Sequence, residues 1–157
     1  MKELLHIDQN DEFPNFFNGI ILNLPDTNAI NVIDFDLNIN TYTNLKVSYP
    51  FYFGFIPRTS IDNYPLFFSF FSDKKFNIFS LLKLEPLYFF KVPKDITINI
   101  VYSKLPDQSI NIDKNSIENI LKDFFEVDTI PSLSKPIHIL ENTNREYKRK
   151  FSKIKKL

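Results

Sequence analysis

The chain has 157 residues, equal numbers of basic and acidic side chains (19 each) and no cysteine. This length indicates one domain, and an apolar content of 43% with 18 phenylalanines is enough to form a core. The zero net charge gives no overall attraction to nucleic acid or to an anionic membrane. The missing cysteines exclude disulfides and thiolate metal sites, and the wide separation of His6 and His138 in sequence disfavours a zinc site.

Glycine occurs only at Gly19 and Gly54, which excludes a GxGxxG dinucleotide fingerprint and a P-loop. The N-terminal residues do not have the pattern of a signal peptide. No apolar run reaches the roughly 18 residues that a membrane span needs. We therefore expect a cytoplasmic protein that makes no membrane contact.

A polar segment at 1–12 suits a short helix or arm, and short apolar or alternating runs then follow at intervals of about 8 to 12 residues. Runs of this kind, bounded by Pro, Asn and Asp, predict strands. The predicted strands are 16–24, 30–37, 42–47, 52–56, 66–71, 78–84, 87–92 and 96–102. A turn at 38–41 joins two of them into a hairpin, and a bend is expected at 54–57.

The apolar period changes from two to 3.6 after these strands. Behind possible N-caps at 113–116, apolar residues recur at helical spacing and predict a helix over 116–126. A last short strand is expected at 137–140 and a basic helix over 142–156. The order of elements predicts one mainly β, α+β domain over 1–157. It is an OB-like closed antiparallel barrel of five or six strands with two C-terminal helices.

Side chains at alternate strand positions, and on the apolar face of the first predicted helix, are expected to be buried. These residues are Phe53, Phe55, Leu66, Phe68, Phe70, Phe124 and Phe125. Tyr49, Phe51, Phe53 and Phe55 alternate with Tyr52, a pattern that is more often found in a core than in a stacking platform.

The most informative stretch lies around Gly54. Residues 49–57 read Tyr-Pro-Phe-Tyr-Phe-Gly-Phe-Ile-Pro, and residues 62–67 read Asp-Asn-Tyr-Pro-Leu-Phe. This stretch resembles the soluble family I inorganic pyrophosphatases, which run Tyr-Pro-x-Asn-Tyr-Gly-Phe/Tyr-Ile-Pro and then Asp-x-Asp-Pro-x-Asp. Weaker similarities keep the same order along nearly the whole chain, at 21–25, 32–36, 85–92, 97–105 and 119–126. The resemblance implies the pyrophosphatase barrel, diphosphate hydrolysis with Mg²⁺, and a homo-oligomer.

In that family, carboxylates hold Mg²⁺ ions that activate water, while Lys, Arg and Tyr side chains hold the phosphates. The resemblance makes Asp62 a candidate catalytic and metal residue and Asp95 a second metal ligand. It makes Arg58 a candidate phosphate ligand and lets Asp34 act on phosphate through a metal or water. Each residue also has a simple structural interpretation: Asp62 as a turn residue, Asp34 on the polar face of a hairpin, and Asp95 and Arg58 in solvent.

Most of the other site positions implied by the resemblance have lost their chemistry. Two of the three acids of the Asp-x-Asp-Pro-x-Asp motif become Tyr64 and Phe67, and the phosphate-binding tyrosine becomes Phe53. Other replacements of acids, lysines and a tyrosine are Asn23, Val32, Thr97 and Asp128-Thr129.

Three functions fit these residues, and we favour the first, a pyrophosphatase-like pseudoenzyme with an eroded site. The second is a divergent, active Mg²⁺-dependent pyrophosphatase whose site is rebuilt by spare acids: Asp36, Asp73, Glu85 and Asp128. The third is a nucleic-acid-binding barrel, because residues 53–56 are similar to the aromatic strand of cold-shock domains. The zero net charge counts against nucleic acid. Any ligand of the eroded site is expected to be phosphate or diphosphate near Arg58.

Overall fold

The computed structural model describes residues 2–109, 112–131 and 135–152. A short 3-10 helix, η1 (Lys2–His6), precedes seven strands and two α-helices. The strands are β1 (Phe17–Asn23), β2 (Ala29–Ile33), β3 (Ile39–Thr43), β4 (Tyr52–Ile61), β5 (Tyr64–Phe70), β6 (Leu81–Pro93) and β7 (Thr97–Lys104). The helices are α1 (Lys114–Phe125) and α2 (Pro136–Phe151).

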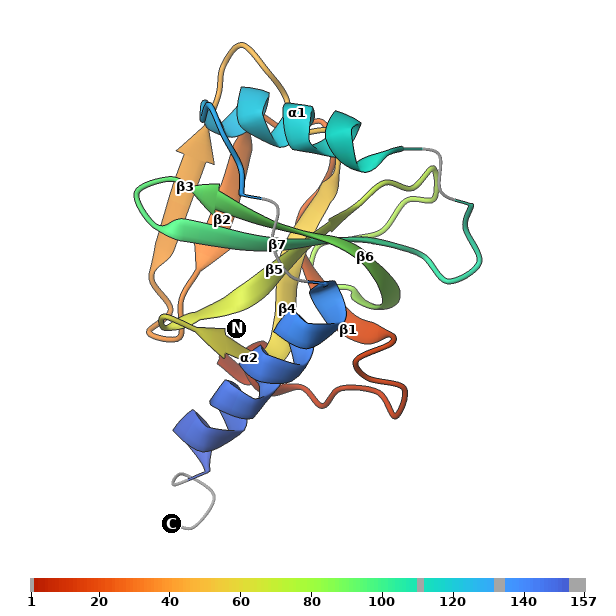
Figure 1. Ribbon diagram of the computed structural model, residues 1–157, viewed down its shortest axis with the longest axis vertical. Coiled ribbons are helices and arrows are strands. Elements are labelled where there is room, and N and C mark those ends of the chain that lie inside the picture. The colour runs from red at the N-terminus through yellow and green to blue at the C-terminus, as the bar shows by residue number, and fades with distance from the viewer. Residues whose placement is uncertain (1, 110–111, 132–134, 153–157) are drawn as a thin grey trace.

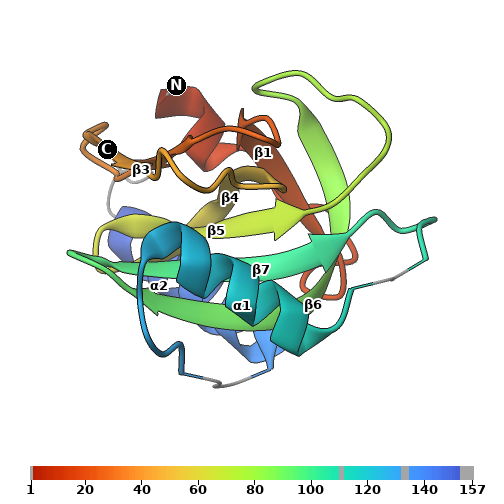
Figure 2. The ribbon, with the colours of Figure 1, turned by 90° about the horizontal axis from the view of Figure 1, so that it is seen from above.

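Five strands close into a barrel in the order β1-β4-β5-β7-β6, which confirms the predicted closed barrel (Figure 1). All neighbouring pairs are antiparallel except β5 and β7, which run parallel. Strands β2 and β3 form a separate two-stranded sheet beside the barrel. Helices α1 and α2 lie at opposite ends of the molecule in this view, and α1 crosses over β6 and β7 when seen from above (Figure 2).

The predicted break between 78–84 and 87–92 is wrong, because β6 runs without interruption from Leu81 to Pro93. The register of β6 against β7 shifts between Pro86 and Tyr88. An irregularity of this kind accommodates a residue that has no N–H to donate to the ladder.

The predicted bend at 54–57 lies further along the chain. Strand β4 continues to Ile61, and its register against β5 is interrupted after Ile56, where Arg58 has a φ of 59°. The Thr59 hydroxyl bridges this irregularity: it donates to the carbonyl of Ile56 at 2.7 Å and accepts from the N–H of Leu66 at 2.9 Å.

The β2–β3 hairpin also turns earlier than expected. The predicted turn at 38–41 is wrong, because the chain reverses between Asp34 and Asn38, with Leu37 at a φ of 67°. Asp34 fixes this position, since its Oδ1 accepts the N–H groups of Asp36 and Asn38, both at 2.9 Å. A short acceptor side chain of this kind stabilises a local turn over a continued strand.

Helix α1 confirms the predicted first helix. Its N-cap is Asp113, whose Oδ1 accepts the N–H of Ser116 at 2.7 Å, and its last turn closes at Glu126 with a left-handed φ of 56°. The strand predicted at 137–140 is wrong, because α2 begins at Pro136, which suits the first turn of a helix. Buried Leu140, Thr143 and Tyr147 then recur at helical spacing. Part of the predicted second helix, residues 153–156, lies outside the described residues.

The barrel strands divide their alternate side chains between two apolar clusters. We call the first the α1-side cluster: it joins barrel residues such as Phe53, Phe67 and Ile100 to β2 and to the buried face of α1. The second, the α2-side cluster, joins Phe68 and other barrel residues to Leu140 of α2. All seven residues predicted to be buried are buried, which confirms the predicted core: Phe53, Phe55, Leu66, Phe68, Phe70, Phe124 and Phe125.

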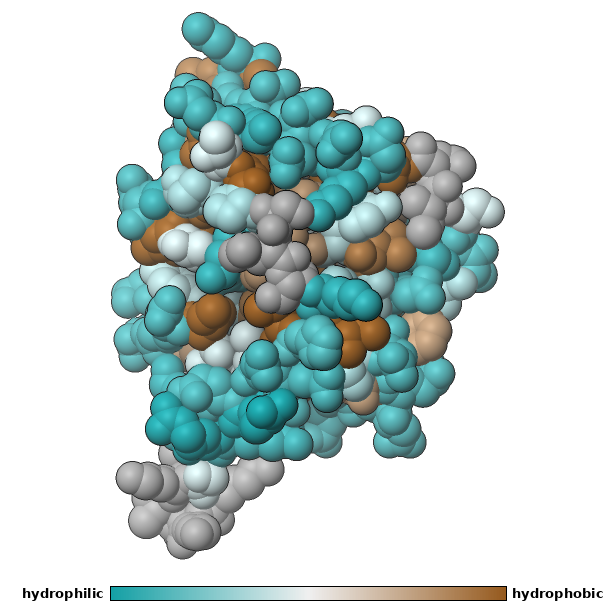
Figure 3. Space-filling view, in the orientation of Figure 1, coloured by the Kyte–Doolittle hydropathy of each residue, from teal (hydrophilic) through white to brown (hydrophobic). Residues whose placement is uncertain are grey.

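The surface in Figure 3 is mostly hydrophilic, with separate hydrophobic patches among polar side chains. Among the described residues, no helix is long and apolar enough to cross a membrane.

Candidate functional site

Three of the positions to which the resemblance assigns site chemistry lie together in the α1-side cluster. Val32, Phe53 and Phe67 come from β2, β4 and β5, and none of them is more than 1% exposed. The rings of Phe53 and Phe67 stack with centroids 5.3 Å apart and an angle of 14° between their planes. Three positions implied to carry a cation, a phenol and a carboxylate are therefore occupied by apolar side chains in mutual proximity.

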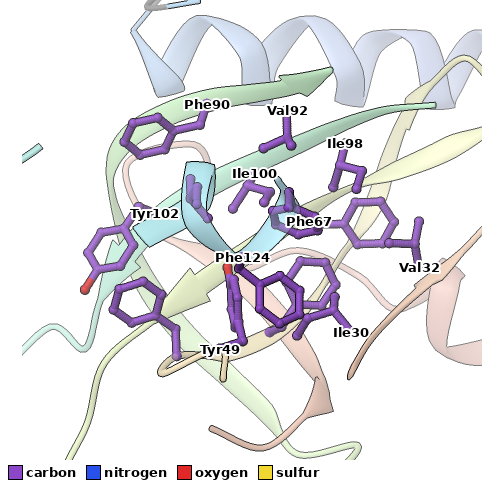
Figure 4. Close-up of a cluster of buried hydrophobic side chains, with 14 of the residues drawn as sticks. Ile30, Val32, Tyr49, Phe67, Phe90, Val92, Ile98, Ile100, Tyr102 and Phe124 are labelled. Carbon is purple, nitrogen blue, oxygen red and sulfur yellow. The ribbon is translucent and has the colours of Figure 1, made fainter. Parts of the chain in front are cut away.

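Aromatic and aliphatic side chains from α1 and the barrel surround this stack (Figure 4). Tyr49 matches the resembling motif and lies in this cluster, and its ring contacts those of Phe53 and Phe124 edge to face. Its hydroxyl lies 2.5 Å from the Ser69 hydroxyl, and burial raises the pKa of Tyr49 well above its ordinary value. The phenol is thus a neutral, internally bonded group.

Asp62 lies at the surface, in the two-residue turn that joins β4 to β5. Asp62 and its neighbour Asn63 both have positive φ, 51° and 67°, as a type I′ hairpin turn requires. Aspartate and asparagine tolerate this conformation better than most residues. The turn borders a polar hollow of about 630 Å³ that is also lined by Glu146, Arg149 and Lys150 of α2.

Asp34 is buried, with 7% of its surface exposed, and its oxygens are engaged within its own turn. Besides the two backbone N–H groups that Oδ1 accepts, Oδ2 accepts the side-chain amide of Asn38 at 3.2 Å. The neighbouring Asp36 accepts the side-chain amide of Asn63 at 2.9 Å, and the amide oxygen of Asn63 accepts from Lys150 at 2.6 Å. These bonds join the two hairpin turns to α2.

Arg58 joins the N-terminal segment to the barrel. Its Nε donates to the carbonyl of His6 at 3.0 Å, and its Nη2 lies 2.7 Å from Oδ1 of Asp8. The guanidinium also stands 5.9 Å from the ring centre of Tyr147 in α2. His6 and Asp8, which bind the guanidinium of Arg58, lie far earlier in the chain. No pattern in the sequence indicates that they pair with Arg58.

Asp95 is exposed in the β6–β7 turn, on the side of the molecule that faces the β2–β3 sheet. The pKa of Tyr42 is raised, first by partial burial and then by the negative charge of Asp95 and by Tyr64. The Tyr64 hydroxyl accepts from the side-chain amide of Asn40 at 3.4 Å. Asp95 therefore lies close enough to the Tyr42 phenol to act on it, and Tyr64, at a position implied to hold a second carboxylate, is a phenol as well.

The described residues do not fit a two-metal centre. Within 2–109, 112–131 and 135–152 there is no group of three or more His, Cys, Asp or Glu side chains placed to hold a metal. The spare acids are dispersed: Glu85 pairs with Lys104 at 2.9 Å, Asp36 bonds Asn63, and Asp73 and Asp128 are exposed.

Two asparagines have structural roles that the sequence did not indicate. Asn44 is buried and donates to the carbonyls of Asp123 and Phe124 at the end of α1, both at 3.1 Å. Asn23, at a position implied to be glutamate, accepts the N–H of Asn31 at 3.0 Å and donates to the carbonyl of Ala29 at 3.3 Å. Asparagine is common in this chain, so the sequence alone does not distinguish Asn44 and Asn23 from asparagines without a structural role.

No family model matches the chain, and no curated protein matches it by sequence. Solved structures do match. The inorganic pyrophosphatase of Thermus thermophilus superposes with a TM-score of 0.68 at 15% identity, over 92% of this chain and 98% of that one. The Coxiella burnetii inorganic pyrophosphatase gives 0.69 at 14% identity, over 90% and 99%. The Helicobacter pylori inorganic pyrophosphatase gives 0.67 at 16%, over 90% and 98%. The chain therefore has the inorganic pyrophosphatase fold, as the resemblance implied.

Proposed function

We propose that this chain is a cytoplasmic pseudoenzyme of the inorganic pyrophosphatase family, which keeps the barrel and does not hydrolyse diphosphate. The observation that carries the proposal is the stacked pair Phe53 and Phe67 in the α1-side cluster. The resemblance places a phosphate-binding phenol and a metal carboxylate at these two positions. The barrel then serves a structural or regulatory role.

The physical argument concerns what Mg²⁺ and diphosphate require. Mg²⁺ keeps near-octahedral oxygen coordination, and a two-metal site needs several carboxylates to hold the ions and activate water. The side chains at these positions provide no carboxylate ligands, and an ion placed among them loses its hydration without compensation. Asp62, Asp34 and Asp95 lie in three different turns, so binding of Mg²⁺ by them is expected to be weak if it occurs at all.

The test is phosphate release from diphosphate in the presence of Mg²⁺, with a wild-type chain and an Asp62→Asn variant. We expect both to match the buffer control. Turnover near the enzyme median of about 10 s⁻¹ that is lost in Asp62→Asn would establish the divergent enzyme instead. Release that persists in Asp62→Asn and copurifies with the chain would also contradict the pseudoenzyme, and it would assign catalysis to acids other than Asp62.

A phosphate or diphosphate ion near Arg58 stays a separate prediction of ligand binding. The guanidinium is already engaged by Asp8 and by the His6 carbonyl, so an anion would have to displace Asp8. Calorimetric titration of phosphate and diphosphate into wild type and Arg58→Ala tests this. Heat that disappears in Arg58→Ala supports the site, and no heat in wild type contradicts it.

The nucleic-acid alternative receives no support from the aromatic strand. The rings of Phe53 and Phe55 are fully buried, whereas stacking on bases needs exposed ring faces. We therefore do not propose nucleic acid as a partner.

A further inference from the structure

The outer edge of β3 has backbone groups with no partner in the described residues. β3 pairs with β2 only, and Figure 1 shows it at the outer margin of the molecule. Two backbone hydrogen bonds fix which residues of β3 bond to β2. The N–H of Asp34 donates to the carbonyl of Asn38 at 3.1 Å, and the N–H of Asn44 donates to the carbonyl of Asn28 at 2.9 Å. Because inward bonds alternate along an antiparallel pair, residues 38, 40, 42 and 44 bond towards β2. The N–H and C=O groups of Ile39, Thr41 and Thr43 therefore point outwards.

This edge lacks the features that normally prevent association between strands. Natural edge strands carry Lys, Pro, bulges or a covering element. Residues 37–45 read Leu-Asn-Ile-Asn-Thr-Tyr-Thr-Asn-Leu, without a charge, a proline or a glycine. Large apolar side chains are also exposed along it: Leu37 is 41% exposed, Ile39 60% and Leu45 92%.

We propose that β3 pairs antiparallel with β3 of a second copy of this chain, around a two-fold axis at Thr41. The outward groups are symmetric about that residue, so Thr41 faces its own equivalent and Ile39 faces Thr43 of the other copy. The two residues of each facing pair can form two backbone hydrogen bonds, each from the N–H of one residue to the C=O of the other. The result is a four-stranded sheet that continues from β2 and β3 of one copy into β3 and β2 of the other, through an isologous contact.

The ends of the strand favour a second copy over an unrelated strand. Antiparallel pairing about Thr41 brings the hairpin turn of one copy, with Asp36 and Leu37, beside the bend of the other copy, with Leu45 and Lys46. The two exposed leucines meet, and the exposed Asp36 and Lys46 have opposite charges. Both matches occur twice in the dimer because of the symmetry. A partner with a different sequence has no reason to supply them.

The first experiment measures molar mass by light scattering for wild type, Thr41→Lys and Thr41→Glu. One chain has a mass of 18.6 kDa, and we expect wild type to approach twice this value as its concentration rises. Each charged variant places two like charges on the axis, so it is expected to stay monomeric with an unchanged circular dichroism spectrum. Mixing the two variants pairs opposite charges and is expected to restore the dimer.

The second experiment uses the absence of natural cysteine to test the register. Thr41→Cys is expected to form a disulfide-linked dimer on oxidation, since facing bonded residues have Cα atoms about 5.5 Å apart. Thr43→Cys is the matched control: in this register the two copies of position 43 are separated by about 13 Å, so this variant is expected to stay unlinked. A mixture of Ile39→Cys and Thr43→Cys is expected to link.

Three results would overturn the proposal. Wild type could remain monomeric at every concentration reached. It could form an oligomer whose mass is unchanged by both charged variants, which would place the interface elsewhere. Thr43→Cys could link as readily as Thr41→Cys, which would indicate a different register or random collision.

Discussion

The α1-side cluster and the surface where α2 meets the hairpin turns differ in the side chains that occupy the positions to which the resemblance assigns site chemistry. In the cluster, the positions implied to be charged or polar hold Val32, Phe53 and Phe67, which fill the space and are shielded from water. At the α2 surface, Asp34 and Arg58 keep their polar groups, and each is bonded to other parts of the protein. The contrast shows that Asp34 and Arg58 each have a structural role, in a turn and in a chain segment, that does not depend on a ligand.

The strongest test of this contrast returns a carboxylate to the cluster with Phe67→Asp. The variant loses the packing of a buried ring, about 3–5 kcal/mol, and buries an unpaired charge as well. The combined loss is comparable to the whole stability of a small domain, so we expect an unfolded or barely folded protein by circular dichroism. Phe67→Leu, which keeps an apolar side chain, is the control and should fold. A stable Phe67→Asp protein would show that the cluster admits water or metal.

Phe124→Ala tests whether α1 is held by the same cluster. Phe124 is 2% exposed and packs against Tyr49 at a centroid distance of 5.1 Å. We expect a loss of about 3–5 kcal/mol in urea unfolding. Phe71, which is 43% exposed, provides the control, and Phe71→Ala should change stability little. A loss below about 1 kcal/mol at Phe124 would be too small for a core phenylalanine.

Asp34→Ala tests the other side of the comparison. The variant leaves the N–H groups of Asp36 and Asn38 without their acceptor, which should cost about 1–3 kcal/mol in unfolding free energy. Asp34→Asn keeps one acceptor oxygen and should recover part of the loss. Equal stability of all three proteins would mean that Asp34 has no structural role, and its persistence would then need a ligand to explain it.

The smallest expected effect is a pH dependence that originates at His6, beside Arg58. Partial burial lowers the pKa of His6 below its ordinary 6.5, and the positive charges of Arg58 and Lys2 lower it further. Between the folded and unfolded pKa values the unfolded chain binds more protons, so stability is lost as pH falls below about 6.5. The neutral ring is also bonded through Nδ1 to the Tyr147 hydroxyl. His6→Gln should flatten the decline in unfolding midpoint between pH 7 and 5, while His138 is present in both proteins. An identical decline in both would assign it to other groups.

The barrel was predictable because its signals are local: alternating apolar residues for the strands, and helical spacing behind Asp113 for α1. The incorrect predictions concern places where one side chain or one tertiary contact decides where a turn or a strand ends. Asp34 moves the hairpin turn by bonding two N–H groups, and the register shift at Pro86 keeps β6 continuous. The partners of Arg58 were not predictable, because η1 and the segment after it reach β4 only in the folded chain.

The two glycines show why a chain can retain part of a sequence motif for structural reasons alone. A Cβ on Gly54 would lie 1.9 Å from the carbonyl oxygen of Ile20 and 2.8 Å from the ring of Phe68, and a Cβ on Gly19 would lie 2.5 Å from the same ring. Both glycines are therefore required by the close approach of β1, β4 and Phe68 that closes the barrel, independently of any phosphate. Selection for a folded chain alone is enough to retain Gly54 and the aromatic residues around it. A motif search centred on this glycine therefore detects the fold, and the positions implied to hold carboxylates, cations and phenols carry the information about the chemistry.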